Sequence, residues 1–157
     1  MVYLLVVLWL VLFKFSSDPL AVLSSYQTRS LNLIPFAGIS SAHLNEAVYN
    51  FVVFIPLGLL LGVNLKKTEF GRKLAYICML SFAIEIVQFV FAIGRTDITD
   101  VITNTLGGLL GLAVYEAGKK HSDNEKLDRS ISIACLTLVI VFTLLRILAL
   151  RVRYQTH

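Results

Sequence analysis

The residues of this chain best suited to do chemistry lie between positions 85 and 104. Glu85 and Gln88 stand three residues apart inside one apolar run, and Asp97, Asp100 and Asn104 follow at steps of three or four. On helices these spacings place side chains on one face. A carboxyl group well inside a membrane costs about 3 kcal/mol, so a functional or tightly paired role is the default for Glu85.

Two kinds of chemistry fit this set. In the first, the polar groups bind an amphiphilic ligand between apolar walls, and Arg95 contacts a phosphate or carboxylate head. In the second, Glu85 acts as the acid or base of an enzyme, and Asp97 and Asp100 are weak candidates for holding a hard divalent cation. The sequence contains no histidines at metal-ligand spacing, no serine–histidine pair and no phosphate-binding glycine loop. Binding therefore ranks ahead of catalysis, and no metal or other cofactor is predicted.

Simpler structural roles compete with these interpretations. Asp97 and Asp100 also suit the N-cap and third position of a helix. Arg95 could pair with either of them as an interfacial anchor. Asn50 and Asn104 suit hydrogen bonds between helices, which is the favoured interpretation for Asn50.

Composition indicates a membrane protein. The 157 residues are 57% hydrophobic and 15% charged, and the apolar share exceeds the roughly 45–50% of soluble domains. The net charge of +4 comes from basic residues between long apolar runs, where they are typical of topology signals. No basic stripe with interleaved aromatic residues is present, so nucleic acid is not an expected partner. Cys78 and Cys135 lie in separate apolar runs and are interpreted as small hydrophobic residues.

The apolar runs predict an all-α fold, a polytopic transmembrane helix bundle of about five spans in a single domain, 1–157. We place the spans at about 1–15, 46–63, 74–92, 100–115 and 131–150, with Asn45 as the N-cap of the second. The first run reaches only about 22 Å, so either its true start is missing or its end extends further. A signal peptide is the rival interpretation, but a basic n-region is lacking. Pro35 disfavours helix before it, so the segment between the first two spans is expected to form a re-entrant or surface-lying loop.

Two glycine pairs, Gly58/Gly62 and Gly107/Gly111, predict faces where helices approach closely. Alternate sides of the predicted spans differ in their basic residues. One side has eight, Lys66, Lys67, Arg72, Lys73, Lys119, Lys120, Lys126 and Arg129, and the other has five, Lys14, Arg29, Arg95, Arg151 and Arg153. The richer side is expected to be cytoplasmic, with the N-terminus also inside.

This orientation gathers the polar residues in the outer half of the membrane or just above it. By helix rise, Glu85 lies about 10 Å below the outer end of its span, and Asn104 lies about 6 Å below the same surface. The inner half is expected to contain no comparable polar set. The residues predicted to bind a ligand are Asn32, Asn50, Glu85, Gln88, Arg95, Asp97, Asp100 and Asn104.

Four stretches resemble the VanZ-like family, in the same order along the chain. They are Asn-Leu-Ile-Pro-Phe at 32–36, Asn50 with Phe-Ile-Pro-Leu-Gly at 54–58, Ser81 through Glu85 to Gln88, and Arg-Thr-Asp-Ile-Thr-Asp-Val-Ile-Thr-Asn-Thr-Leu-Gly at 95–107. The resemblance covers a core of about 31–113. It implies a multi-pass protein of the bacterial cytoplasmic membrane, because the family consists of small bacterial membrane proteins. The family is named for a member linked to teicoplanin resistance, which implies a link to the cell envelope or to glycopeptide response.

Three functional classes therefore remain open. The favoured one is a protein that binds or modulates an envelope lipid or a lipid-linked ligand. The second is a membrane-embedded enzyme acting on such a lipid through Glu85. The third is a structural partner of another membrane protein, in which the polar residues serve packing alone.

Overall fold

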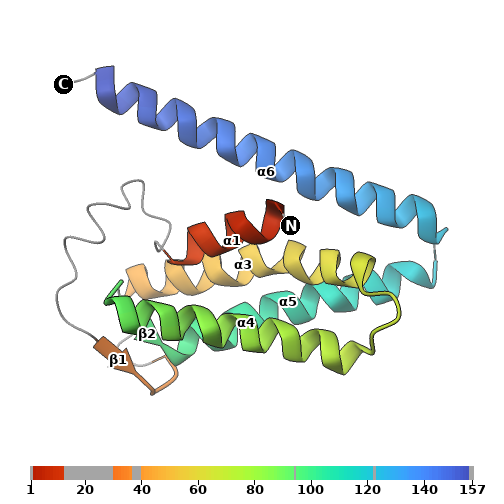
Figure 1. Cartoon of the computed structure of the whole chain (residues 1–157), viewed down its shortest axis with the longest axis horizontal. Coiled ribbons are helices and arrows are strands. Elements are labelled where there is room, and N and C mark those ends of the chain that lie inside the picture. The colour runs from red at the N-terminus through yellow and green to blue at the C-terminus, as the bar shows by residue number, and fades with distance from the viewer. Residues whose placement is uncertain (1, 13–29, 37–39, 94, 122, 156–157) are drawn as a thin grey trace.

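The computed structural model describes residues 2–12, 30–36, 40–93, 95–121 and 123–155. Its helices are α1 (Val2–Leu12), α3 (Ser41–Asn64), α4 (Phe70–Phe91), α5 (Ile98–Lys119) and α6 (Asn124–Gln155). Two short strands, β1 (Ser30–Asn32) and β2 (Arg95–Asp97), complete the described elements. Figure 1 shows α3, α4 and α5 running side by side, with α1 between them and α6. The predicted all-α bundle is confirmed, and the two strands were not predicted.

Four of the helices are long and apolar enough to cross a membrane: His43–Asn64, Phe70–Phe91, Ile98–Lys119 and Asn124–Leu145. They correspond to the last four predicted spans. Each begins two to seven residues earlier than predicted, and the ends fall between five residues before and four residues after the predicted ones. Hydropathy marks the part of a helix that suits hydrocarbon, whereas the helix itself continues through polar turns beyond it. The eleven residues of α1 reach about 16 Å, roughly half of the hydrocarbon core. Residues 13–15, which belonged to the predicted first span, lie outside the described part.

The predicted start of the second span is wrong. The N-cap of α3 is Ser40, whose hydroxyl accepts a hydrogen bond from the backbone N–H of His43, so the helix begins five residues before the predicted 46. Asn45 lies inside the helix. A serine hydroxyl caps a helix as well as an asparagine does, and the first turns of α3, with polar Ser41, His43, Asn45 and Glu46, extend the helix before the apolar run.

Helix α5 is the central element and α6 a peripheral one. Half of the residues in an apolar 18-residue stretch of α5 are buried within the protein, compared with 11% in the corresponding stretch of α6. Helices α3 and α5 run parallel and touch through both glycine pairs. A Cβ atom added at Gly58, Gly107 or Gly111 would collide with a backbone carbonyl oxygen of the facing helix, that of Gly108, Phe51 or Ile55 respectively. The predicted close packing is therefore confirmed.

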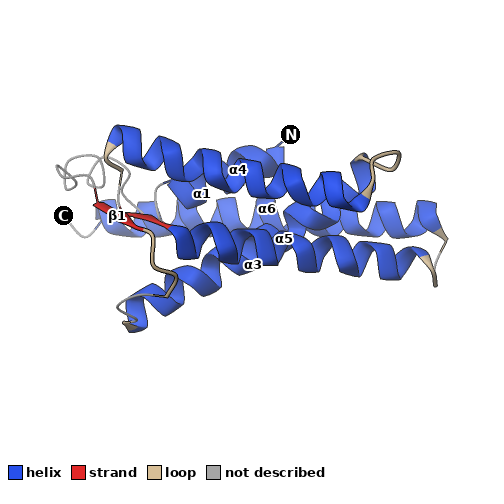
Figure 2. Cartoon of the chain, turned by 90° about the horizontal axis from the view of Figure 1, so that it is seen from below, coloured by secondary structure: helices blue, strands red, loops and turns tan. Residues whose placement is uncertain are grey.

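The two strands join the loop before α3 to the turn before α5. They pair in parallel, with Ser30 opposite Arg95 and Asn32 opposite Asp97. Figure 2 shows both strands, in red, at one end of the bundle, beside the start of α5. Ala92 ends α4 in the left-handed conformation (φ 52°), which reverses the chain toward β2. The Asn32–Phe36 motif thereby comes to lie against the 95–107 motif.

Candidate functional site

The site begins at the N-terminus of α5. Asp97 caps this helix, because its Oδ1 accepts a hydrogen bond of 2.9 Å from the backbone N–H of Thr99. The predicted capping role of Asp97 is therefore observed. The same carboxylate accepts hydrogen bonds from the side-chain amide of Asn32, 3.1 Å to each oxygen. Asn32 thus attaches the 32–36 stretch to the 95–107 stretch.

A second contact holds the same loop in place. The backbone N–H of Phe36 donates a 3.0 Å hydrogen bond to the hydroxyl of Thr99. Asn32 also stabilises its own turn, accepting from the backbone N–H of Ile34 and donating to the carbonyl of that residue. The loop before α3 is consequently attached to the start of α5 by strand pairing and by two side chains.

Glu85 meets this junction from α4. Its Oε2 accepts a 2.9 Å hydrogen bond from the backbone N–H of Asp97, and its own backbone carbonyl accepts from the hydroxyl of Thr96 at 3.4 Å. Only 4% of Glu85 is exposed. The predicted proximity between Glu85 and the head of the next helix is therefore observed.

A pocket of about 190 Å³ lies over this contact. Two of its lining residues, Glu85 and Thr96, are polar, and the other seven are the apolar residues Leu31, Leu33, Phe82, Ile86, Phe89, Ile98 and Val101. Leu31 and Leu33 flank Asn32, so the loop that Asn32 fastens forms one wall. The pocket combines apolar walls with one carboxyl group.

The other predicted residues lie around the pocket without lining it. Gln88 turns toward α1, where its Nε2 donates to the carbonyl oxygens of Val11 (3.0 Å) and Leu12 (3.4 Å). Asn104 donates a 2.8 Å hydrogen bond to the hydroxyl of Ser81 on α4. Asn50 and Asp100 are buried, with 2% and 5% of their surfaces exposed. Arg95 contributes its backbone to β2, and its side chain lies outside the described part of the structure.

Gln88 has a role that its spacing from Glu85 did not indicate. The last carbonyl groups of a helix have no partner within that helix, which is costly in an apolar environment. The amide of Gln88 donates to the carbonyl groups of Val11 and Leu12, the last two described residues of α1. Gln88 therefore positions α1 rather than facing the pocket.

A metal site receives no structural support from the described residues, among which no group of three His, Cys, Asp or Glu side chains could hold an ion. Asp97 is already engaged as a helix cap and as the acceptor for Asn32. Asp100 stands in the first turn of α5, where a carboxylate interacts favourably with the helix dipole.

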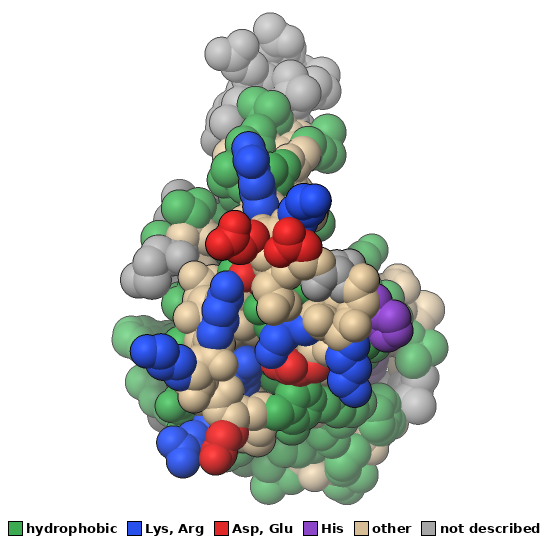
Figure 3. Space-filling view, turned by 90° about the vertical axis from the view of Figure 1, so that its right-hand side faces the viewer, with side chains coloured by type: hydrophobic (Ala, Val, Ile, Leu, Met, Phe, Trp, Pro, Cys, Tyr) green, Lys and Arg blue, Asp and Glu red, His purple; other side chains and the backbone are tan. Residues whose placement is uncertain are grey.

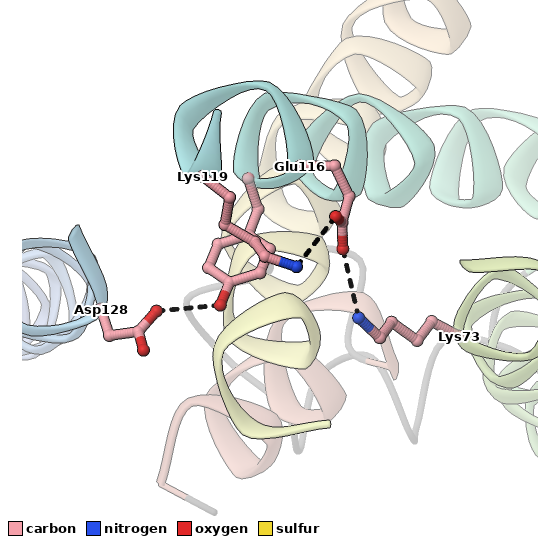
Figure 4. A network of polar contacts seen from close by, with 5 residues as sticks. Lys73, Glu116, Lys119 and Asp128 are labelled. Carbon is pink, nitrogen blue, oxygen red and sulfur yellow. Dashed lines mark hydrogen bonds and ion pairs between the residues drawn. The ribbon is translucent and has the colours of Figure 1, made fainter. Parts of the chain in front are cut away.

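The opposite end of the bundle holds a polar cluster in which several of the basic residues predicted to share one side meet acidic partners. There Lys and Arg side chains gather with Asp and Glu over the α3–α4 and α5–α6 connections (Figure 3). Glu116 contacts the ammonium groups of both Lys73 (3.4 Å) and Lys119 (3.1 Å), and the hydroxyl of Tyr115 donates to Asp128 at 2.9 Å (Figure 4). Asp128 also pairs with Lys66. The pairing of these basic residues with Glu116 and Asp128 was not predicted from the sequence.

Hydropathy alone hides this cluster, because its charges come from four segments and meet only in three dimensions. The one local signal is the spacing of three residues between Glu116 and Lys119, which is common on solvated helices. Lys73 is buried, with 2% of its side chain exposed, although a lysine near a predicted span end is expected to reach solvent.

Comparison with known proteins identifies the family of this chain. The family model described as VanZ/LLP1 matches residues 1–119, which include α1, both strands and α3 to α5. Protein VanZ from Enterococcus faecium is 47% identical over 155 residues, covering 99% of this chain and 89% of that protein. No solved structure matches the chain. With a family model that spans three quarters of its length and a relative that is similar throughout, the chain belongs to the VanZ/LLP1 family of membrane proteins.

Proposed function

We propose that the pocket binds the hydrocarbon part of an envelope lipid or of a lipid-linked ligand. In this way the protein contributes to the response of a bacterial envelope to glycopeptide antibiotics of the teicoplanin type. The observation that carries the proposal is the pocket's lining of seven apolar residues around Glu85. A cavity of this character suits an amphiphile, whose chain replaces lipid contacts and whose polar part meets the carboxyl group.

The exposure of the walls supports entry from the membrane. Phe82 and Ile86 on α4 are 53% and 51% exposed, and Leu33 in the loop is 66% exposed. In a membrane these apolar surfaces face hydrocarbon rather than water. A lipid chain therefore reaches the pocket sideways, without crossing a polar barrier.

The distribution of charge supports an outward-facing pocket. The cluster of Lys66, Lys73, Lys119 and their acidic partners lies at the end of the bundle opposite the pocket. Basic connections favour the cytoplasmic side, and this rule supports our proposal that the pocket faces the outer side of the cytoplasmic membrane. Leu33→Cys should then react with an impermeant thiol reagent in intact cells, and Lys67→Cys should react only after permeabilisation. The reverse pattern would move the pocket to the cytoplasmic side.

The binding role is tested by filling the pocket. Ile86→Trp adds bulk to a lining residue, and Ile133→Trp makes the same change at an α6 residue of similar exposure, 54%, far from the pocket lining. Each variant is expressed in a teicoplanin-susceptible bacterium, with protein amount measured by immunoblot and susceptibility by growth inhibition. We expect Ile86→Trp to lose protection and Ile133→Trp to keep it. Equal protection by both variants at equal amounts would refute the pocket as the functional site.

A catalytic role for Glu85 is the second candidate, favoured by the position of its carboxyl group in the pocket lining. It predicts turnover of an envelope lipid that is lost in Glu85→Gln. Comparing the lipids of membranes with and without the protein distinguishes the two roles. A changed lipid that depends on Glu85 supports an enzyme, and an unchanged lipid profile together with protection supports binding.

A further inference from the structure

We infer that the end of the bundle opposite the pocket binds the headgroups of anionic phospholipids. This part of the protein, called the basic end below, consists of residues 65–73 and 116–129, which form the α3–α4 connection, the α5–α6 connection and the adjoining helix turns. Lipid binding here is independent of the pocket, because it involves other residues and requires no particular orientation of the protein in the membrane.

The basic end carries an excess of positive charge. It contains eight Lys or Arg residues against five Asp or Glu residues, a formal excess of three positive charges. The basic residues are Lys66, Lys67, Arg72, Lys73, Lys119, Lys120, Lys126 and Arg129, and the acidic residues are Glu69, Glu116, Asp123, Glu125 and Asp128. Figure 3 shows Lys and Arg side chains spread over this face of the molecule. An anion is therefore attracted to the basic end as a whole.

Two of the acidic residues are already engaged between helices. Glu116 pairs with the ammonium groups of Lys73 (3.4 Å) and Lys119 (3.1 Å), and these contacts join α4 to α5 (Figure 4). Asp128 pairs with Lys66, which joins α6 to the α3–α4 connection. Three basic and two acidic side chains meet in this inner network, so it retains one positive charge. Its carboxylates hold the bundle together and do not neutralise the basic residues outside it.

The outer basic residues have donors to spare. Four of them are exposed and form no ion pair with any described residue: Lys67, Lys120, Lys126 and Arg129. The charge of Arg72 is balanced by Glu69, which leaves Asp123 and Glu125 as the exposed acidic residues near these four. Ammonium and guanidinium groups donate hydrogen bonds and accept none, and a phosphate diester supplies the matching acceptors and a negative charge.

The position of the basic end along the helices favours a lipid over a soluble anion. Lys67 lies between a candidate span that ends at Asn64 and one that begins at Phe70, and Lys120 directly follows the span that ends at Lys119. Lys126 and Arg129 stand in the first two turns of α6. The phosphates of a bilayer occupy the level just outside the hydrocarbon core, where these side chains lie. Clusters of about four to eight Lys or Arg residues beside membrane helices are typical of anionic-lipid recognition.

Basic residues at such positions also orient a chain during insertion. That role needs positive charge in the connections, whatever its partners in the folded protein. The folded structure adds that four of these residues remain unpaired and exposed at headgroup level. The basic end is therefore inferred to keep contact with anionic headgroups after insertion is complete.

Photo-cross-linking with headgroup probes tests this inference. The full chain is reconstituted into nanodiscs of equimolar phosphatidylcholine and phosphatidylglycerol that contain a trace of one of the two lipids with a diazirine beside its phosphate. Mass spectrometry gives the labelling of peptides that cover residues 64–73 and 119–130. The ratio of labelling by the phosphatidylglycerol probe to labelling by the phosphatidylcholine probe measures selection of the anionic headgroup. Labelling of residues 40–49, at the other end of α3, serves as the reference for the amount of probe in each sample.

We expect a ratio of about five at the basic end, which is the effect of one basic residue near an anionic surface. Lys120→Gln/Lys126→Gln removes two unpaired positive charges and should bring the ratio at 119–130 toward one. Lys120→Arg/Lys126→Arg keeps both charges and should preserve the ratio, and Glu125→Gln removes an exposed negative charge and should raise it. None of these three side chains has an ion pair with a described residue, so each variant should fold as the parent does.

Two results would overturn the inference. A ratio near one at both segments of the parent protein would mean that the basic end does not select anionic lipid and is a solvated surface or one that meets an acidic protein. A high ratio that stays the same in Lys120→Gln/Lys126→Gln would mean that the unpaired residues do not hold the headgroup. Neither result affects the pocket, whose role is tested separately by Ile86→Trp.

Discussion

Replacing glycine by alanine should lower the stability of the protein where α3 and α5 touch, and should leave it unchanged or raise it at an open position. Gly107→Ala and Gly111→Ala each add a methyl group that meets a backbone carbonyl oxygen of α3, that of Phe51 or Ile55. A backbone atom cannot rotate away, so the two helices must separate. Gly71→Ala makes the same change near the start of α4, where an added Cβ has no other atom within 4 Å.

The structure also ranks the magnitudes. Overpacking a tight contact costs about 1–3 kcal/mol, and we expect Gly107→Ala and Gly111→Ala near the upper end because backbone must move. Gly108→Ala should cost less, since its Cβ would meet side-chain atoms of Ile77, Cδ1 and Cγ2 both at 2.7 Å, and a side chain shifts more easily than backbone. Gly71→Ala should be neutral or stabilising by up to about 1 kcal/mol, because alanine favours helix and restricts the unfolded chain.

The free energy of unfolding can be measured by titrating purified protein in mild detergent with sodium dodecyl sulfate and following helical circular dichroism. A cost of 2 kcal/mol changes the folded-to-unfolded ratio by a factor of about 30, well within the range of such a titration. The expected order of stability is Gly71→Ala, then Gly108→Ala, then Gly107→Ala and Gly111→Ala. Equal stability at positions 71, 107 and 111 would show that α3 and α5 are not in direct backbone contact.

Three further predictions concern the contacts on either side of this interface. Asn32→Ala removes the amide that holds Asp97, so hydrogen exchange at the N–H of Phe36 should accelerate about tenfold or more. The control Asn64→Ala removes an exposed contact within α3 and should leave this exchange rate unchanged. An unaltered exchange rate in Asn32→Ala would mean that Asn32 does not fasten the loop. Glu116→Gln leaves the buried ammonium of Lys73 without its carboxylate and should lower the free energy of unfolding by about 2 kcal/mol in the same titration. The control Glu69→Gln disrupts the pair with Arg72, which is more than two-thirds exposed, and should have little effect. Similar losses in both variants would argue against burial of Lys73. In a background without the native cysteines, a short bifunctional thiol reagent should cross-link the Ser81→Cys/Asn104→Cys pair, because the native side chains are hydrogen-bonded at 2.8 Å. Failure of this cross-link would argue against the contact between α4 and α5 at this depth.

The sequence by itself determined the class of the protein and the positions of its helices. Long apolar runs specify membrane helices because the backbone must satisfy its own hydrogen bonds in hydrocarbon, and this rule depends on local composition alone. The glycine pairs identified the closest interface for a related reason, since small residues at a spacing of four form one flat face. The capping role of Asp97 could also be predicted from the sequence, because a helix cap involves residues only a few positions apart in the chain.

Only the tertiary structure decided which polar residues belong together. Spacing placed Gln88 beside Glu85, yet Gln88 satisfies the end of α1, a helix 76 residues earlier in the chain. The pairing of β1 with β2 and the Asn32–Asp97 contact join segments 65 residues apart, and three-residue strands carry too little pattern to be recognised locally. The buried Lys73–Glu116 pair escaped prediction because its members stand on different helices. Local patterns fix where a helix lies along the chain, whereas the partner of a buried polar group depends on which neighbour the folded chain places within hydrogen-bonding distance.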